Sequence, residues 1–360
     1  MWEAYRRRSR RSPAFTDRRT IKPVKVDGSL TDNLSEIANR ARQLESGGYD
    51  GAYTFEGPHD PFLPVLLAAE HTDRLELSTA IAVAFARNPM TLAQTAYDLQ
   101  SVSEGRFILG LGSQIRPHIE KRFSMPWSKP AARMRELALA IRAIWACWHE
   151  GEPLRFDGDF YRHTLMTPFF NPGPNPYGPP RLWLAGVGPA MTEVAGEVAD
   201  GFLVHPFSTE RFLREVTLPA LERGFERGGR TRDGFEIAFP LMILTGDSDE
   251  EIAAAEGGVR RQLAFYGSTP AYRRVLDVHG WGELQPELNR LSKEGRWEEM
   301  GGLIGDDLVD TFTVRGAPEE IAPQVLGRYG DLVDRISFNA PYRADPARWA
   351  VVLEGFKVGA

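Results

Sequence analysis

Strand-like and helix-like segments alternate along this chain from residue 24 almost to its end. The helical patterns are bounded by typical signals, such as Asn88-Pro89 at a start and Gly47-Gly48 at an end. The strand-like segments are Val24–Asp27, Gly51–Phe55, Leu75–Val83, Phe107–Leu111, Leu182–Ala185, Gly201–Val204, Phe235–Leu244 and Arg335–Phe338. Eight strands with intervening helices, without a break in composition, predict one (β/α)8 barrel domain over residues 24–360.

A doubly wound sheet is the structural alternative, but its dinucleotide-binding fingerprint is incomplete here. Ile115 stands where the third glycine would follow Gly110-Leu-Gly112, and Met191 where it would follow Gly186-Val-Gly188. Two stretches, residues 151–180 and 269–310, are too long for simple connections between a strand and a helix. We expect them to be insertions that cover or shape a site, as long loops on barrels commonly do.

Residues 1–23 precede the first strand and are rich in arginine. No apolar segment follows the cluster at residues 6–11, so a secretory signal is not expected, and we interpret residues 1–23 as a disordered basic extension. A tail that binds nucleic acid or a membrane surface is the alternative. The whole chain has a net charge of −6 in spite of this extension. The acidic body therefore argues against nucleic acid as the main partner.

Several classes of function lack their usual residues. The single cysteine, Cys147, lies in an apolar helical pattern, which excludes an intramolecular disulfide and is typical of core packing. The seven histidines show no metal-binding spacing, so no metal is expected. No apolar run approaches the roughly 20 residues that cross a bilayer. We therefore expect a soluble, cytoplasmic protein with no membrane partner.

Polar residues that follow the predicted strands are the candidates for chemistry, because the carboxyl ends of barrel strands surround the active site. Glu56 and His59 follow the second strand, and either side chain is suited to general acid–base catalysis. Asp60 has the position of a helix cap instead. Asp27, His205 and Asn339 end other strands and are candidate substrate contacts.

Three further segments suggest a flat cofactor that carries a phosphate. Small and branched residues at Thr79, Ala80 and Ile81 suit the face of an aromatic ring, although plain barrel packing is the alternative. Ser113 and Gln114 follow two glycines and offer neutral hydrogen bonds. Finally, a glycine-rich turn precedes a helix and presents unpaired N–H groups to an anion. It consists of Gly186, Val187, Gly188 and Pro189. Together these features indicate a flavin-like redox site without a metal.

Longer motifs resemble the luciferase-like monooxygenase superfamily. The motifs are Arg87–Gln94, Ser103–Gly112, Leu184–Pro189 and Ala195–Gly201. Within that superfamily the chain resembles the coenzyme F-420-dependent oxidoreductases. This finer resemblance rests on Glu56–Pro61, Gly112–His118, Pro130–Glu136 and His163–Pro168. It extends over about residues 24–342 and leaves residues 1–23 outside.

The resemblance implies a barrel of the bacterial-luciferase type, commonly a homodimer, with a deazaflavin at its C-terminal face. A non-prolyl cis bond that supports the ring would fall near Thr79-Ala80, and Ser113 and Gln114 would bind the cofactor. The turn from Gly186 to Pro189 would hold its phosphate. The chain departs from better-known members at Glu56, where they carry aspartate, and at Gly57, where several carry histidine. Ile115 replaces the catalytic glutamate of the sugar-phosphate dehydrogenases.

The function expected from the resemblance is hydride transfer between coenzyme F-420 and a small organic substrate, with Glu56 or His59 handling the proton. Two alternatives stay open. One is a two-component monooxygenase that uses reduced FMN and oxygen on the same fold. The other is a flavin- or deazaflavin-binding protein without catalysis.

Overall fold

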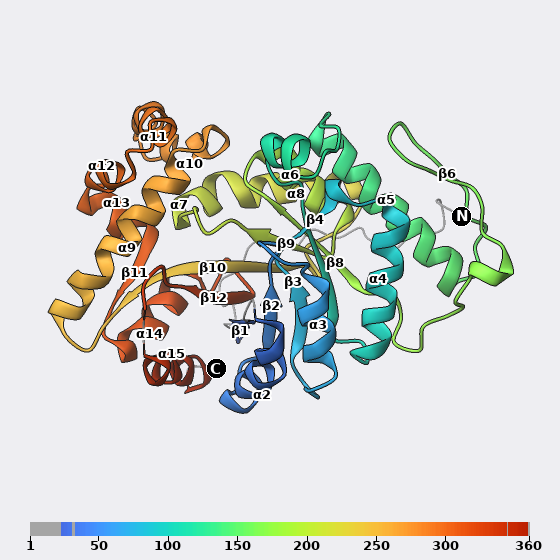
Figure 1. Ribbon diagram of the computed structural model, residues 1–360, viewed down its shortest axis with the longest axis horizontal. Helices are drawn as coiled ribbons and strands as arrows, with labels where there is room; N and C mark the ends of the chain where they lie inside the picture. The colour runs from blue at the N-terminus through green and yellow to red at the C-terminus, as the bar shows by residue number, and fades with distance from the viewer. Residues whose placement is uncertain (1–22, 31–32, 344, 359–360) are drawn as a thin grey trace, which may run out of the picture.

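The computed structural model describes residues 23–30, 33–343 and 345–358 (Figure 1). The basic extension predicted at residues 1–23 therefore lies outside the described residues, apart from Pro23. Within the described part, helices surround a sheet in which the strands of the main ring run parallel to one another.

Parallel strands close into a barrel, as the sequence predicts. Their order around the ring is β1 (Lys25–Ser29), β2 (Gly51–Thr54), β3 (Glu76–Thr79), β5 (Phe107–Gly112), β8 (Arg181–Gly186), β9 (Gly201–Val204), β10 (Glu236–Thr245) and β12 (Arg335–Asn339). The ring closes where β12 pairs with β1, with Lys25 opposite Arg335. Because all eight strands are parallel, their carboxyl ends form one rim, the mouth of the barrel.

The third strand differs from its prediction. Instead of one strand over Leu75–Val83, β3 ends at Thr79 and a short strand, β4 (Ala82–Val83), continues the pairing with β5. A further strand, β11 (Thr313–Gly316), pairs with the end of β10 and was not expected. The first strand extends two residues beyond Asp27, to Ser29.

Helices α2 (Ile37–Gly47), α3 (Phe62–Ala69), α4 (Pro89–Val102), α5 (Pro130–His149), α6 (Pro189–Val198), α7 (Glu210–Phe212), α8 (Leu218–Gly228), α9 (Asp249–Gly267), α14 (Pro318–Tyr329) and α15 (Pro346–Val358) follow or connect the strands. Local chemistry sets several ends. Asn88 accepts a hydrogen bond from the Thr91 N–H at 3.0 Å, with Pro89 next in the chain. Gly48, at φ 88°, ends α2 in the left-handed conformation that favours glycine.

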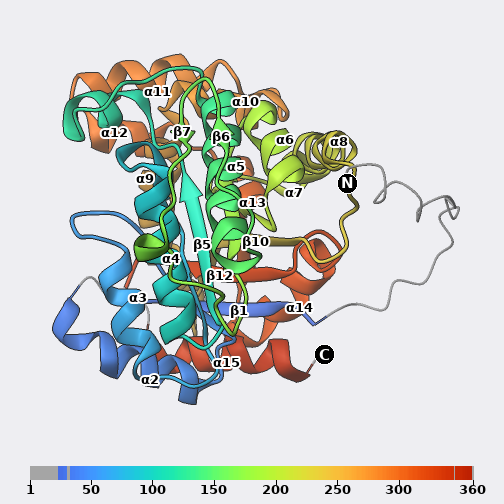
Figure 2. The same ribbon diagram turned by 90° about the vertical axis from the view of Figure 1, so that its right-hand side faces the viewer.

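The segment 151–180 lies against the outer helices α4 and α5 (Figure 2). It contains a hairpin of β6 (Phe156–Asp157) and β7 (Arg162–His163). Glu136 of α5 accepts the N–H groups of three hairpin residues, and the Tyr97 hydroxyl of α4 accepts the Asn175 N–H at 2.8 Å. Tyr177 lies beside Gly105, near the start of β5. This last part therefore packs far from the mouth, which it was expected to cover.

The segment 269–310 is mostly helical and gathers at one side of the molecule (Figure 1). It contains α10 (Arg273–Asp277), α11 (Leu284–Lys293), α12 (Trp297–Gly302) and most of α13 (Asp306–Phe312). These helices enclose a second apolar core with α9, separate from the main core of the barrel. Phe312 stacks on Phe207 at a centroid distance of 4.6 Å, so this helical segment is joined to the barrel just beyond β9.

Candidate functional site

Glu56 follows β2 by two residues, and hydrogen bonds hold its carboxylate in one orientation. Its Oε2 accepts a hydrogen bond from the Val83 N–H at 2.7 Å and from Arg87 Nη1 at 2.6 Å. The side chain is only 6% exposed, and Arg87 also reaches Asp60 at 3.1 Å. The arginine thus fixes the loop after β2 to the end of β4. Among the described residues, no hydrogen bond reaches Glu56 Oε1, which leaves that oxygen for a ligand.

The other two ionisable residues of this loop are placed differently. His59 is exposed. Asp60 accepts the Phe62 N–H at 2.8 Å and so binds the first N–H of α3, but Pro61, not Asp60, is the N-cap, because the helix begins one residue later than expected. The structure therefore brings Glu56 close to the third strand, whereas His59 lies at the surface.

The chain beyond β3 places apolar residues, here called the floor, at the mouth of the barrel. A cis peptide bond joins Ala80 to Ile81, one bond beyond the position expected near Thr79-Ala80. Thr79 is fully buried, and its hydroxyl donates to the Gly110 carbonyl at 2.8 Å and accepts the Gly110 N–H at 3.0 Å. Ile81 lies over Gly112, where an added Cβ would come within 2.9 Å of it. Of the three predicted ring contacts beside β5, Ala80 and Ile81 are partly exposed, whereas Thr79 is fully buried and presents no surface to a ring.

Ser113 and Gln114 follow β5 and turn toward their own loop. Gln114 has φ 58°, and its Oε1 accepts the Ile115 N–H at 3.0 Å. The Ser113 hydroxyl donates to the Gln114 carbonyl at 3.1 Å. Both residues are partly exposed. A ligand could therefore replace these local hydrogen bonds with its own bonds to the Ser113 hydroxyl and the Gln114 amide.

The predicted phosphate turn has the form that an anion site requires. Gly186 ends β8, Gly188 caps α6 with φ −84° and ψ 150°, and Pro189 is the first residue of the helix. No heavy atom lies within 4 Å of the position that a Cβ on Gly188 would occupy. Pro189 has no N–H, and the Met191 and Thr192 N–H groups donate to the Gly188 carbonyl, so among the described first-turn residues the Ala190 N–H is the one left for an anion. These residues, with Val187 between them, fit a phosphate.

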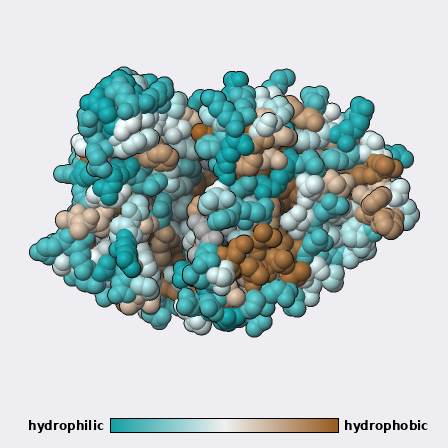
Figure 3. Space-filling model, in the orientation of Figure 1, coloured by the Kyte–Doolittle hydropathy of each residue, from teal (hydrophilic) through white to brown (hydrophobic). Residues whose placement is uncertain are grey.

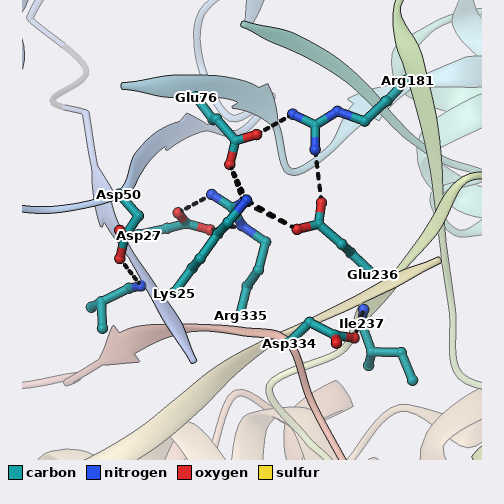
Figure 4. Close-up of polar contacts among 10 residues, drawn as sticks. Lys25, Asp27, Asp50, Glu76, Arg181, Glu236, Ile237, Asp334 and Arg335 are labelled. Carbon is teal, nitrogen blue, oxygen red and sulfur yellow. Dashed lines mark hydrogen bonds and ion pairs between the residues drawn. The ribbon is translucent and has the colours of Figure 1, made fainter. Parts of the chain in front are cut away.

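Asp27 is not brought to the mouth. It lies within β1, is 9% exposed, and is bound by Arg335 from the first position of β12. Figure 4 shows the surrounding cluster of alternating charges. The cluster consists of Lys25, Asp27, Glu76, Arg181, Glu236 and Arg335. Apart from Asp27, each of these residues is the first of its strand, so the cluster fills the amino-terminal end of the barrel, opposite the mouth.

His205, by contrast, follows β9 at the mouth. Its Nδ1 accepts the Phe207 N–H at 3.0 Å, and its ring contacts Tyr266 and Tyr272 at centroid distances of 4.9 and 4.4 Å. Burial lowers the pKa of His205 to about 3, so the imidazole is neutral. Asn339, the last residue of β12, is partly exposed at the same rim.

Three tyrosines were not among the predicted site residues. Tyr53 of β2 forms side-chain hydrogen bonds with Ser337 and Ser29. Its phenol also contributes, after burial, to raising the pKa of Tyr266. Tyr53 has a signal in the sequence, since it lies near the end of a predicted strand. Tyr266 ends a helix and Tyr272 lies in the insertion. No local pattern indicates that these two residues return to the mouth.

A search of the described residues finds no helix with the length and apolarity needed to cross a membrane. In the same residues no three His, Cys, Asp or Glu side chains are arranged to hold a metal ion.

Comparisons with known proteins agree on the family. The profile of the luciferase-like monooxygenase family matches residues 17–335. An uncharacterized protein of Mycobacterium tuberculosis is 58% identical over 313 residues, which cover 87% of this chain and 92% of that protein. An F-420-dependent glucose-6-phosphate dehydrogenase of Nakamurella multipartita is 29% identical over 284 residues, covering 76% and 80%.

Among solved structures, the coenzyme F-420-dependent tetrahydromethanopterin reductase of Methanopyrus kandleri superposes with a TM-score of 0.74. It is 20% identical, and the match covers 93% of this chain and 97% of the reductase. At this identity the match concerns the fold, and it agrees with the closed barrel described above.

Proposed function

This chain belongs to the luciferase-like monooxygenase family, and from that membership we propose that it is an F-420-dependent oxidoreductase acting on a small organic molecule. The relatives named for F-420 support the choice of cofactor. The observation that carries the proposal is the arrangement at the mouth. The apolar residues Ala80 and Ile81 beside β5, and a helix start with open space at Gly188, suit the ring and the phosphate of a phosphorylated deazaflavin.

Bound F-420 would supply a carbon centre that gives or accepts a hydride. The residues of this chain then have separate tasks. Ala80 and Ile81 support the ring, Ser113 and Gln114 bind its polar edge, and the turn at Gly188 binds the phosphate. Arg87 holds Glu56 through Oε2, and Oε1 has no hydrogen-bond partner among the described residues. Glu56 then moves the proton that accompanies hydride transfer. His59, at the surface, is the second candidate for that task.

A two-component monooxygenase that uses reduced FMN is the second candidate function, since the family is named for monooxygenases. A third candidate is a flavin- or deazaflavin-binding protein without turnover. The three proposals differ in which cofactor binds and in whether an organic substrate is then converted.

The decisive experiment is a titration of the purified protein with F-420 and FMN, each oxidised and reduced. We expect micromolar or tighter binding of F-420 and much weaker binding of FMN. A preference for reduced FMN would move the assignment to oxygen-dependent chemistry, and binding of neither would contradict the site. Binding of F-420 without conversion of any compound in a broad panel would favour the protein without catalysis.

The phosphate turn can be tested in the same assay with a matched pair of variants. Gly188→Asp places a carboxylate at the helix start, where it would repel a phosphate. Gly305→Asp is the control, because Gly305 caps α13 in a similar conformation, φ −73° and ψ 165°, and also has open space around it. We expect F-420 affinity to fall at least about tenfold in Gly188→Asp. The control should bind as the unchanged protein does.

A further inference from the structure

Beyond the cofactor region, the mouth contains an aromatic cluster that consists of His205, Tyr266 and Tyr272, here called the His205 subsite. His205 follows β9, and Gly186 at the phosphate turn pairs with Val204, so the subsite adjoins the turn. Tyr266 of α9 and Tyr272 of the segment 269–310 lie against the His205 ring. The subsite therefore lies over the mouth and beside the region assigned to the cofactor.

The local chain fixes the hydrogen atom of the imidazole. The Phe207 N–H donates to Nδ1 at 3.0 Å, so Nδ1 acts as an acceptor and the neutral ring carries its proton on Nε2. The ring is held from two sides, since Tyr266 meets it edge-on at 77° and Tyr272 lies tilted at 44°. Nε2–H is thus a hydrogen-bond donor with a fixed orientation.

The two neighbouring phenols are also uncharged groups. Burial, followed by the influence of Tyr266, raises the pKa of Tyr272 to about 12. Burial is also the main cause that raises the pKa of Tyr266. Both rings and the imidazole remain partly exposed, so the subsite has an open side. It combines aromatic walls with a few polar hydrogens, which is the composition of a small-molecule site.

Charge is lacking around His205. Within the part of the chain that the structure describes, the hydrogen bond and the ring contacts of His205 are with the Phe207 N–H, Tyr266 and Tyr272, none of which is a charged side chain. Burial is accordingly the cause that lowers its pKa. A carboxylate or phosphate bound here would lose its water without gaining a counter-charge, which is unfavourable. A carbonyl or hydroxyl oxygen would instead gain a hydrogen bond at a small desolvation cost.

We propose that the His205 subsite binds the substrate, that the substrate is an uncharged and largely apolar carbonyl compound or alcohol, and that Nε2–H of His205 binds its oxygen. This inference rests on the proposed function, because it places the oxygen beside the assigned cofactor. A neutral imidazole releases its Nε2 proton very poorly, so His205 orients the oxygen and a different group supplies the proton. Tyr266 and Tyr272 position the imidazole and bound the apolar body of the substrate.

The test uses the protein loaded with oxidised F-420 and two matched probes, cyclohexanone and 3-oxocyclohexanecarboxylate, with affinities measured by calorimetry. We expect the unchanged protein to bind the neutral ketone at least about tenfold more tightly than the charged one, the factor that corresponds to one net hydrogen bond. Equal affinities, tighter binding of the charged ketone, or binding of neither would overturn the inference. This comparison depends on no variant.

Two substitutions then examine His205 itself. His205→Phe keeps an aromatic ring and removes the donor, whereas His205→Gln keeps a donor. We expect His205→Phe to weaken cyclohexanone binding about tenfold and His205→Gln to recover part of it. Unchanged affinity in His205→Phe would contradict the role of Nε2–H.

F-420 affinity separates the two proposals. It should stay within about threefold in both variants, which also shows that they are folded. If the unchanged protein does not bind F-420, that result contradicts the proposed function and not only the role of His205. If His205→Phe does not fold, Tyr272→Leu replaces it, with the same expected loss of ketone affinity because a wall of the subsite is removed.

Discussion

Arg335 and Asp27 form a two-bonded ion pair inside the barrel. Arg335 Nε lies 2.9 Å from Asp27 Oδ2, and Nη2 lies 2.6 Å from Oδ1. The arginine side chain is 1% exposed and also lies over the Trp183 ring at 5.6 Å. The pair joins β1 to β12, where the barrel closes, so it contributes to the closure of the ring at the end opposite the mouth.

Replacement of Asp27 by asparagine should destabilise the protein strongly. It leaves a buried guanidinium without its main partner, and a broken buried pair typically costs about 3–5 kcal/mol. Urea unfolding at pH 7 measures the free energy of unfolding. Asp157→Asn is the control, because its pair with Arg162 is exposed and such pairs contribute about 0–1 kcal/mol. F-420 affinity should not change. If Asp27→Asn raises KM without lowering stability, Asp27 contacts the substrate, as the sequence predicted, and does not stabilise the barrel.

Glu76 should make stability depend on acid pH. Burial alone would raise its pKa, but Arg335, Arg181 and Lys25 together lower it to about 2. Since the pKa in the unfolded chain is near the ordinary glutamate value of 4.5, Glu76 stabilises the folded state above that pH, and the contribution disappears as the pH falls toward 2. The full effect is about 3 kcal/mol.

The check compares the free energy of unfolding of the unchanged protein and Glu76→Gln between pH 7 and pH 2. We expect the difference between the two to be largest at pH 7 and to shrink from about pH 5 downward. Glu319→Gln, an exposed carboxyl on α14, should give a small and nearly constant difference. A difference for Glu76→Gln that does not vary with pH would contradict the assigned role of its cluster.

Thr79→Val should weaken both stability and cofactor binding. The valine has nearly the same shape but removes the hydroxyl that bonds the Gly110 carbonyl and N–H, which leaves two buried backbone groups without a partner. Each such group costs about 1–3 kcal/mol. Thermal unfolding and the F-420 titration measure the two effects. Thr79→Ser retains the hydroxyl and should stay close to the unchanged protein in both assays.

Glu56→Gln should lower turnover at least about 100-fold, the usual scale for loss of a general acid or base. The glutamine can still accept the Arg87 and Val83 hydrogen bonds, so F-420 affinity should be retained. The assay is F-420-linked oxidation or reduction of a substrate found by screening neutral carbonyl compounds. Asp60→Asn, which also contacts Arg87, serves as the control. Turnover near that of the unchanged protein would remove Glu56 from the chemistry.

We propose that α3 provides the interface of a homodimer. Figure 3 shows an apolar area over this helix, where Leu63 and Leu66 are 51% and 39% exposed and Phe55 nearby is 46% exposed. The double variant Leu63→Glu/Leu66→Glu should be a monomer in analytical ultracentrifugation, whereas Leu303→Glu, which is also at an exposed leucine, should not change the association state. If the unchanged protein is a monomer in the same measurement, the proposal is wrong.

The elements that depend on near neighbours could be predicted from the amino-acid sequence. Periodicity located all eight strands of the ring, because a strand buried on both faces is a short apolar run between turn signals. Asn88-Pro89 predicted the start of α4, and Gly186–Pro189 predicted the turn into α6, because caps and turns act over a few residues. The cis bond was expected within one residue of where it lies, through the resemblance to the family.

The end of the barrel that each polar side chain faces depends instead on the folded arrangement of distant segments. Asp27 looked like a residue at the mouth, yet its partner Arg335 is 308 positions away and draws it into the amino-terminal cluster. Tyr272 looked like part of a remote insertion, yet it packs against His205. Such pairs form when the ring closes and the insertion folds over it. Local patterns hold no information on that closure, because it depends on contacts between distant segments.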